Sequence, residues 1–348
     1  MMEIREKIKE WYHINKRSLP WREISDPYQI WVSEIILQQT RVMQGMDYYH
    51  RFLERFPNLE SLAIAEEAEV LKVWEGLGYY SRARNMQAAA KYILHERKGV
   101  FPETFKEMMK MKGVGPYTAA AVSSIAFHEP QAVVDGNVHR VISRLFGIEE
   151  APGTYTSSSR IQAEAYSLLD QEDPGNHNQA VMELGALVCT PTSPDCSSCP
   201  LQQDCVAYLQ NRIAELPLKN KPGRRRRRYF HYLVIQDREA IWIGRRTGKD
   251  IWEGLFEFPL IETTRPYSTK SLRATSEWLN LFGSTVQALQ VTGPFRHILS
   301  HQEIIAKFYH LNEPPDLVLE GYKKIKLGRM DPYPLPKLIL NYINRKYS

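Results

Sequence analysis

The stretch Gly113-Val-Gly-Pro-Tyr-Thr-Ala-Ala-Ala-Val122 joins two helical patterns through a glycine turn. The first pattern runs from Phe105 to Met109, and the second resumes at Tyr117. Glycine lets backbone N–H groups approach a ligand closely, and Pro116 suits the first position of a helix. A helix N-terminus at this place attracts phosphate. The stretch therefore predicts a helix-hairpin-helix over about residues 105–126, or in the simpler interpretation a helix–helix connection that binds nothing.

Two carboxyl side chains form the next candidate site. Asp135 ends a short apolar run and opens another helical pattern, so it is expected to cap that helix, with a lowered pKa that keeps it ionised. Glu34 shares a helical face with Ile30 and Leu37, and burial among apolar neighbours predicts a raised pKa. A neutral glutamic acid beside an aspartate is the pair that acid-assisted glycosidic cleavage requires. Alternatively, one is only a helix cap and the other a core glutamate hydrogen-bonded to a polar neighbour.

The four cysteines of the chain all lie within seventeen residues, with the spacing C-x6-C-x2-C-x5-C. They are Cys189, Cys196, Cys199 and Cys205. Thiolates crowded in this way are ligands for iron-sulfur clusters or zinc. Zinc modules usually pair their cysteines in two short knuckles, whereas only one short pair occurs here. We therefore expect a [4Fe-4S] cluster with a structural role, and zinc is the alternative.

The bulk composition describes a folded protein with an uneven charge distribution. The 348 residues are 43% hydrophobic, which favours two globular domains. The net charge is +5, and five consecutive arginines occupy residues 224–228. No segment has the apolar length of a signal peptide or a membrane span. We therefore expect a cytoplasmic protein, associated with the nucleoid.

Taken together, these residues resemble the helix-hairpin-helix DNA glycosylases that carry an iron-sulfur loop, and within them the MutY family. The resemblance covers nearly the whole chain. Besides the hairpin, Asp135 and the cysteine loop, it is carried by Pro20-Trp-Arg22, Trp31-Val-Ser-Glu-Ile-Ile-Leu-Gln-Gln-Thr-Arg41 and Gly76-Leu-Gly-Tyr-Tyr80. It implies hydrolysis of the N-glycosidic bond of adenine mispaired with 8-oxoguanine or guanine in double-stranded DNA, which leaves an abasic site.

The resemblance also implies a role for each matched residue. Glu34 would protonate the adenine at N7, Asp135 would stabilise the oxocarbenium ion, and Asn137 would order this carboxylate and water. Gln39 and Tyr79 would wedge into the duplex, where amide and aromatic groups can fill the gap left by an extruded base. The remaining positions implied to bind substrate or DNA are Trp21, Arg22, Leu37, Thr40, Leu77, Gly113, Gly115 and Glu183.

Tyr117 distinguishes two kinds of glycosylase. Relatives similar to endonuclease III have a lysine two residues after the glycine turn, and this lysine forms a Schiff base. A phenol cannot form an imine, so water is expected to intercept the sugar and strand nicking is expected to be weak. The chain departs from the family at Met111-Lys112, where Leu-Pro is frequent, and this lysine lies outside the nucleophile position.

The sequence pattern changes after Pro217, from alanine-rich helical stretches to short segments in which apolar and polar residues alternate. We expect a helical catalytic domain over residues 1–216, a basic linker over 217–228 and an α+β domain over 229–348. The arginine run is either a solvated tether or a phosphate contact. Strands are expected at 230–236, 240–244 and 303–310, with a helix near 272–282.

The second domain resembles the MutT-like, Nudix-type module of the same family, most clearly in Trp252-Glu-Gly-Leu-Phe-Glu-Phe-Pro259. The glutamate-rich helix that holds magnesium in a working Nudix hydrolase is missing after Pro259, which favours lesion recognition. By resemblance, Ser300 and His301 would face the 8-oxoguanine, beside Leu299 where the family often has an aromatic residue. A plain hairpin loop is the alternative.

Two other functions remain open at the level of the sequence. The first is an endonuclease III-like lyase acting on damaged pyrimidines, which Tyr117 and the long C-terminal domain disfavour. The second is an iron-sulfur DNA-binding sensor whose carboxylates are only structural. We expect a monomeric enzyme, because the two linked domains of one chain suffice to bind opposite faces of one duplex.

Overall fold

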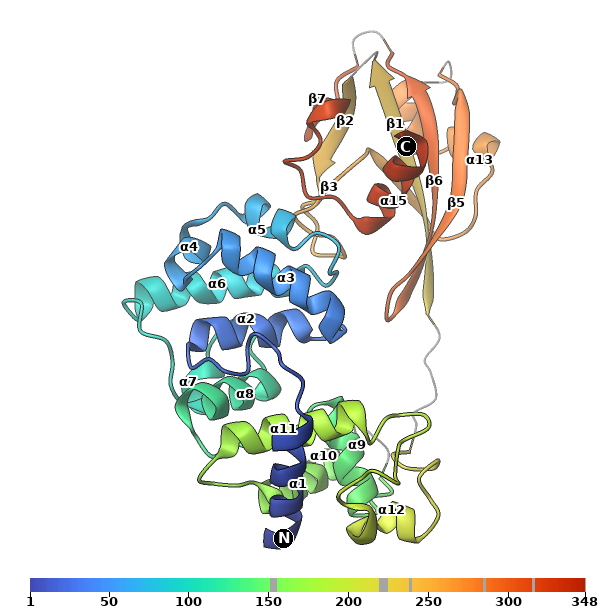
Figure 1. The fold of residues 1–348 in the computed structure, drawn as a ribbon. Helices are drawn as coiled ribbons and strands as arrows, with labels where there is room; N and C mark the ends of the chain where they lie inside the picture. The colour runs from blue at the N-terminus through green and yellow to red at the C-terminus, as the bar shows by residue number, and fades with distance from the viewer. Residues whose placement is uncertain (151–154, 219–224, 238–239, 284–285, 315–316, 348) are drawn as a thin grey trace. The chain divides into compact units, whose positions relative to one another are not determined.

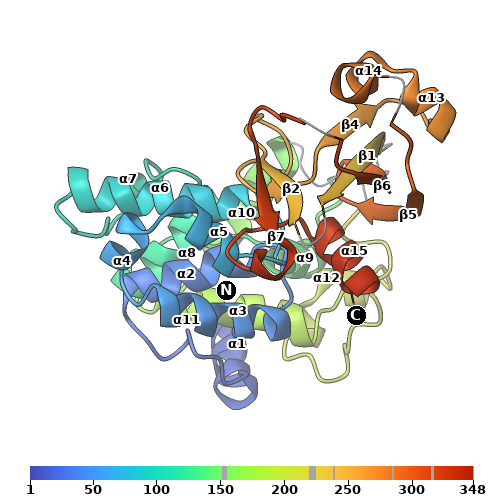
Figure 2. The same cartoon turned by 90° about the horizontal axis from the view of Figure 1, so that it is seen from above.

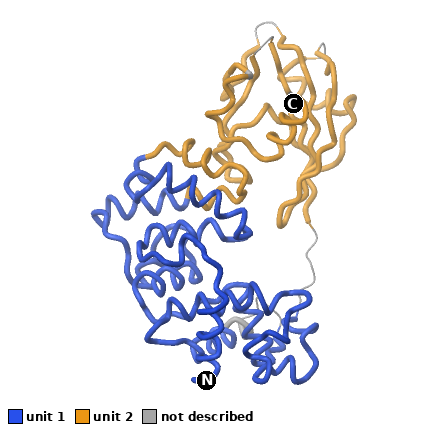
Figure 3. The backbone as a smooth tube through the Cα atoms, viewed as in Figure 1, with its two compact units in different colours: residues 1–64, 85–221 blue, residues 65–84, 222–348 orange. Residues whose placement is uncertain are grey.

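The computed structural model describes residues 1–150, 155–218, 225–237, 240–283, 286–314 and 317–347. The chain divides into two compact units (Figure 3). The first unit contains Met1–Ile64 and Asn85–Lys221, and the second contains Ala65–Arg84 and Pro222–Ser348. The second unit thus takes in twenty residues from within the predicted helical domain.

The first unit is helical (Figure 1). Its helices are α1 (Met2–Asn15), α2 (Pro27–Leu37), α3 (Val42–Arg55), α4 (Leu59–Ile64), α6 (Ser81–Glu96, whose first turn belongs to the second unit), α7 (Phe105–Met108), α8 (Pro116–Phe127), α9 (Gly136–Leu145), α10 (Tyr155–Leu168), α11 (Pro174–Leu187) and α12 (Val206–Leu209), with the 3₁₀ turn η1 (Gln202–Asp204). No helix in the described ranges is long and apolar enough to cross a membrane.

Local sequence sets the beginnings of these helices. The side chains of Asp26, Asp135 and Asp173 accept backbone N–H groups at the N-termini of α2, α9 and α11. Proline occupies the first position of α2, α8 and α11, where its missing N–H costs no hydrogen bond. The predicted cap at Asp135 is therefore present.

Packing buries α2 and α8 on nearly all sides. α2 contacts α8 and α3, and α8 also contacts α11. In α2 the residues from Ile30 to Ile36 are all buried, including Ser33 and Glu34. A separate apolar cluster joins α1, α9, α10 and α11 around Leu184, which has no exposed surface. Glu34 thus lies on a buried helix, where little water reaches its carboxyl group.

The second unit is built on a mixed sheet of seven strands among the described residues. The order is β3-β2-β1-β6-β5, with β4 paired to β1 and β7 paired to β2. Among the strands that the structure describes, only β1 and β6 pair in parallel. The strands are β1 (Arg226–Asp237), β2 (Ala240–Arg245), β3 (Phe256–Glu257), β4 (Leu260–Thr263), β5 (Gln290–Ile298), β6 (Gln302–Asn312) and β7 (Tyr322–Lys326).

Helices cover both faces of this sheet (Figures 1 and 2). On one face α15 (Lys337–Tyr347) packs through Tyr342, whose ring stacks on Phe308 at 3.8 Å. On the other face lie α13 (Thr269–Arg273) and α14 (Ser276–Phe282), where Trp278 is fully buried among residues of β1 and β6. Alternate residues of β6 face opposite helices, as the pleat requires. The unit also contains α5 (Glu67–Val73) and the 3₁₀ turn η2 (Leu327–Arg329).

The predicted strands at 230–236, 240–244 and 303–310 are confirmed as β1, β2 and β6. The expected helix near 272–282 is two helices. The first ends at Arg273, and Thr275 caps the second by accepting the N–H of Trp278. β1 begins at Arg226, so the last three residues of the predicted linker belong to the sheet. Residues 219–224 of that linker lie outside the described ranges.

Arg228 fits neither interpretation of the arginine run. Its side chain is 7% exposed and forms ion pairs with Asp250 and Glu262 at 2.5 and 2.6 Å. Its guanidinium also lies 5.0 Å from the centre of the Phe230 ring. Arg228 is therefore neither a solvated tether nor a phosphate contact, whereas Arg227 remains 65% exposed.

Candidate active site

Glu34 and Tyr117 meet although 83 positions separate them in the sequence. The Tyr117 hydroxyl donates a hydrogen bond of 2.6 Å to Glu34 Oε2. Burial raises the pKa of Glu34 to about 7; the hydrogen bond from Tyr117 opposes this rise, and the charge of Asp135 adds to it. At neutral pH the carboxyl is therefore divided between its acid and its ionised form, as a general acid requires.

Asp135 lies at the start of α9, where its two oxygens have separate partners. Oδ1 accepts the N–H of Val138 at 2.7 Å, and Oδ2 accepts the side-chain amide of Asn137 at 2.8 Å. The expectation of a lowered pKa was wrong. Burial raises the pKa of Asp135 and outweighs these hydrogen bonds, which favour the carboxylate.

The glycine turn precedes α8 and its Tyr117. Gly113 has φ +80°, and a Cβ at this position would lie 2.5 Å from Asn85 Cβ, so only glycine fits without displacement. Gly115 is the N-cap of α8, with φ −98° and open space around it. Lys112 is exposed on the turn. The predicted hairpin is thus α7, this turn and α8.

Glu183 forms a buried ionic cluster with two arginines. It is 1% exposed and accepts bidentate hydrogen bonds from Arg17 at 2.8 and 2.6 Å and from Arg22 at 2.9 and 2.6 Å. Burial alone would raise the pKa of Glu183, but the hydrogen bonds from both arginines hold it at about 2. The resemblance had named Glu183 and Arg22 and missed Arg17. Arg22 belongs to the matched Pro20–Arg22 motif, and Arg17 lies three residues before it; this proximity is the only signal that the sequence offered.

The other predicted residues of the first unit differ in exposure. Trp21 is buried edge-on against Tyr49 at 5.2 Å, while Leu37 and Thr40 are half-buried. Gln39 is exposed and has φ 58°, a conformation uncommon for residues other than glycine. Of this group Gln39 is therefore the side chain most available to a ligand.

Family models match both parts of the chain. Residues 32–164 match the HhH-GPD superfamily of base excision DNA repair proteins, and residues 231–345 match a NUDIX domain. An adenine DNA glycosylase of Buchnera aphidicola from Schizaphis graminum is 37% identical over 74% of each chain. The mouse adenine DNA glycosylase is 35% identical over 88% of this chain and 70% of its own. The chain belongs to the adenine DNA glycosylase family. It is accordingly a base excision repair enzyme, as the sequence predicted.

Solved structures agree with this family fold. A thermostable thymine-DNA glycosylase matches 60% of this chain and 95% of its own, at 27% identity and a TM-score of 0.54. An endonuclease III in a non-covalent DNA complex matches 60% of this chain and 97% of its own, at 22% identity and a TM-score of 0.51. The predicted combination of a helical glycosylase domain and a Nudix-type α+β domain is confirmed.

The cysteine loop of this adenine DNA glycosylase contains four free, half-buried thiols. In the described residues no three His, Cys, Asp or Glu side chains are gathered closely enough to hold a metal ion. The donor set nevertheless suits an anionic cluster. Cys189, Cys199 and Cys205 pack against the core, and the buried guanidinium of Arg144 donates to Cys189 Sγ at 3.3 Å. That positive charge would offset the negative charge of thiolate ligands.

Arg140, which the sequence analysis did not name, connects this loop to Asp135. It donates to the Cys189 carbonyl at 2.6 Å and to Asn137 Oδ1 at 2.9 Å. Asn137 in turn donates to Asp135. Arg140 follows Asn137 by three residues, so the two side chains lie on the same face of α9. This helical spacing is the signal by which the sequence could have identified Arg140.

In the second unit of the adenine DNA glycosylase, Tyr79 contacts the predicted recognition turn. Ser300 and His301 form the exposed connection between β5 and β6. The Tyr79 hydroxyl forms a hydrogen bond with Ser300 Oγ, and 47% of the Tyr79 surface stays exposed. Leu77, two residues earlier, is half-buried. Two predicted DNA contacts from distant sequence positions are thus adjacent.

Proposed function

We propose that this enzyme hydrolyses the N-glycosidic bond of adenine mispaired with 8-oxoguanine or guanine in duplex DNA. The substrate base would be flipped out of the duplex, because its bond to the sugar is inaccessible within the stack. The product is an abasic site and free adenine. The similar proteins from Buchnera and mouse are named for adenine as the excised base.

The main support is the buried carboxyl group of Glu34. It accepts a hydrogen bond from Tyr117, and the charge of Asp135 helps to raise its pKa. With a pKa of about 7, Glu34 can donate a proton to the leaving adenine at neutral pH. Asp135, oriented by Val138 and Asn137, would counter the positive charge that develops on the sugar. Water then adds to the sugar, and the proton it loses restores the acid.

Tyr117 supports a hydrolytic enzyme without lyase chemistry. Its phenol hydrogen-bonds to Glu34 and cannot form an imine with the sugar. We assign the recognition of the opposite base to Ser300 and His301, with Tyr79 beside them to fill the space left by the flipped adenine.

The cysteine loop would carry a [4Fe-4S] cluster held by Cys189, Cys196, Cys199 and Cys205. Bound cluster would close the polar loop 189–205 around a rigid centre and stabilise its packing next to Arg144. With this cluster bound, fresh protein should show a visible absorption band near 400 nm. A colourless protein containing zinc would refute this assignment.

The test uses duplexes with adenine opposite 8-oxoguanine, guanine or thymine, and a duplex with thymine glycol, each followed by alkali. We expect cleavage after alkali of the first two only. An Asp135→Asn variant should bind the mispaired duplex and release no adenine. Excision from the thymine glycol duplex, or a covalent adduct trapped by borohydride, would instead identify a lyase. Binding without any excision would identify a sensor.

A further inference from the structure

One face of the second unit carries four basic residues on two elements. β5 and α15 together contain Arg296, Lys337, Arg345 and Lys346, and no aspartate or glutamate. Glu303, on the neighbouring strand β6, forms ion pairs with Arg296 and Arg227. Arg345 forms no ion pair with any described residue, and it is exposed.

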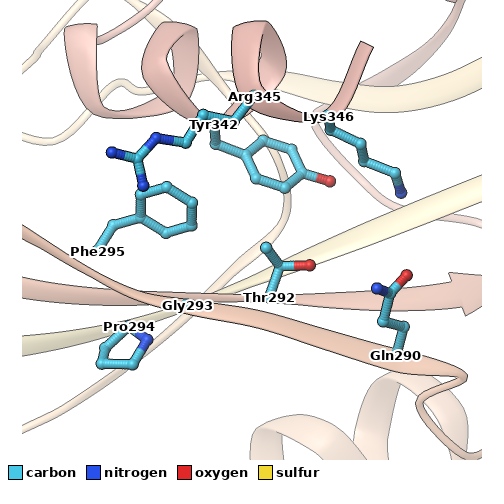
Figure 4. Close-up of a pocket in the computed structure, with 8 residues that line it drawn as sticks. All are labelled: Gln290, Thr292, Gly293, Pro294, Phe295, Tyr342, Arg345 and Lys346. Carbon is cyan, nitrogen blue, oxygen red and sulfur yellow. The ribbon is translucent and has the colours of Figure 1, made fainter. Parts of the chain in front are cut away.

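Two concavities, each of about 550 Å³, lie along this face. Pro294, Phe295 and Arg345 contribute to the walls of both. The first also includes Tyr342 and Lys346, and it lies between α15 and β5 (Figure 4). The second adds Arg296, His297, Asn341 and Asn344. No carboxylate lines either concavity, although Arg296 of the second is paired with Glu303. An anionic ligand would meet positive charge and hydrogen-bond donors there.

Two of the three cations of α15, Arg345 and Lys346, contact neutral groups. The Arg345 guanidinium lies 5.3 Å from the centre of the Phe295 ring. Lys346 Nζ lies 2.5 Å from His310 Nδ1, and His310 Nε2 lies 3.1 Å from Thr292 Oγ1. Burial and the nearby Lys346 lower the pKa of His310 to about 4, so its neutral ring accepts the hydrogen bond. The contact with the Phe295 ring leaves the positive charge of Arg345 in place.

We propose that the face formed by β5 and α15 binds the sugar-phosphate backbone of the DNA strand that carries the base opposite the adenine. This inference rests on the function proposed above, because β5 leads directly into the turn Ser300–His301. Arg296 precedes Ser300 by four residues, which is about 13 Å along a strand. That length corresponds to about four nucleotides of axial rise in one DNA strand.

The chemistry of the face favours a phosphodiester backbone. Several cations spread along an open surface match a row of phosphates, and the amides of Gln290, Asn341 and Asn344 can donate to phosphate and sugar oxygens. Such contacts position the protein and do not read the sequence. The expected contribution is therefore to the affinity for every duplex, with no contribution to the choice of base.

The experiment measures duplex affinity against salt concentration by fluorescence anisotropy. All proteins carry Asp135→Asn so that no base is released, and the duplexes are undamaged or contain adenine opposite 8-oxoguanine. Each phosphate contact adds about 0.9 to the slope of log K against log salt. Arg345→Gln should lower that slope by about 0.9, and Arg345→Gln with Lys346→Gln by about 1.8. The affinity should fall by the same factor for both duplexes.

Lys270→Gln is the matched control, because it removes one positive charge from α13 on the other face of the sheet. It should keep the parental slope. Melting temperatures confirm that the variants fold, and Arg345→Gln alone disturbs no described hydrogen bond. An unchanged slope in both variants would overturn the inference. So would variants that no longer bind free dATP but bind the duplexes as the parental protein does, because the face would then bind a free nucleotide. Failure of the proposed function is recognised separately, by a parental protein that does not prefer the 8-oxoguanine duplex.

Discussion

At the scale of single residues, the Tyr117–Glu34 hydrogen bond has two opposed effects. It fixes the carboxyl in position, and it favours the ionised form, which is the form without a proton to donate. Burial has the larger influence and keeps the pKa of Glu34 near 7. The side chain can thus supply a proton at neutral pH although a donor points at it.

The pH profile of excision should therefore report on Glu34. Single-turnover rates should fall as pH rises through about 7, because the acid form is lost. In Tyr117→Phe this alkaline limb should move to higher pH, since the hydrogen bond that favours the carboxylate is gone. Glu34→Gln should lose about 10²-fold or more of the rate at all pH values. A limb that stays in place in Tyr117→Phe would contradict this role.

The ion cluster of Glu183 predicts a different dependence on pH, in stability. The pKa of Glu183 is about 2 in the folded chain and near 4.5 when unpaired. Because the folded pKa is depressed, the stabilisation is present above about pH 4.5 and is lost as pH falls towards 2. The shift corresponds to on the order of 3 kcal/mol.

Urea denaturation of the native protein and of Glu183→Gln tests this expectation. The native free energy of unfolding should decline between about pH 5 and pH 2 by more than that of the variant. At pH 7 the variant should be less stable by about 3–5 kcal/mol, because two arginines lose their counter-charge in a buried site. If the free energy of unfolding declined equally with pH in both proteins, the low pKa assigned to Glu183 would be refuted.

At the scale of elements, the hairpin turn contains two glycines that meet different requirements. Gly113 adopts φ +80° against Asn85, and Gly115 caps α8 in an ordinary extended conformation. Gly113→Ala should cost about 1–3 kcal/mol of stability and should weaken DNA binding, because the turn must shift.

Gly115→Ala is the control for that substitution, since it adds the same methyl group where no atom lies within 4 Å. Its stability should change by less than about 1 kcal/mol. Thermal melts and anisotropy with an undamaged duplex measure both quantities. Equal losses in the two variants would show that backbone conformation at Gly113 is not the cause.

At the scale of the whole molecule, the segment Ala65–Arg84 belongs to the same compact unit as the C-terminal sheet. Arg84 donates to Glu253 Oε2 at 2.7 Å, and Glu75 accepts the backbone N–H of Leu335 at 2.8 Å. A cut at the composition boundary near residue 216 would therefore separate this segment from its partners.

A protein truncated after residue 216 should accordingly be cleaved by protease within 65–84 faster than the full chain. The apolar and ionic partners of that segment would be missing, and local unfolding would become easier. Limited trypsin digestion followed by mass spectrometry identifies the first cuts. Equal resistance of residues 65–84 in both proteins would show that the segment is stable without the sheet.

The sequence alone determined the features that depend on neighbouring residues. The hairpin turn, the Asp135 cap and the alternating strands of the second unit each follow from a few consecutive residues, because caps, glycine turns and strand pleats are local effects. The resemblance of these motifs to known glycosylases added the reaction. The cysteine spacing belongs to the same class of local signal.

Only the tertiary structure decided which distant groups meet and how much water reaches them. The contact of Tyr117 with Glu34 spans 83 positions, and that of Arg17 with Glu183 spans 166. The pKa of Asp135 is raised rather than lowered, because burial on folding outweighs the local cap. Arg228 is an ordinary member of an arginine run in the sequence, yet it is buried and paired in the sheet. Burial and long-range pairing depend on the packing of the whole chain, and no short stretch encodes them.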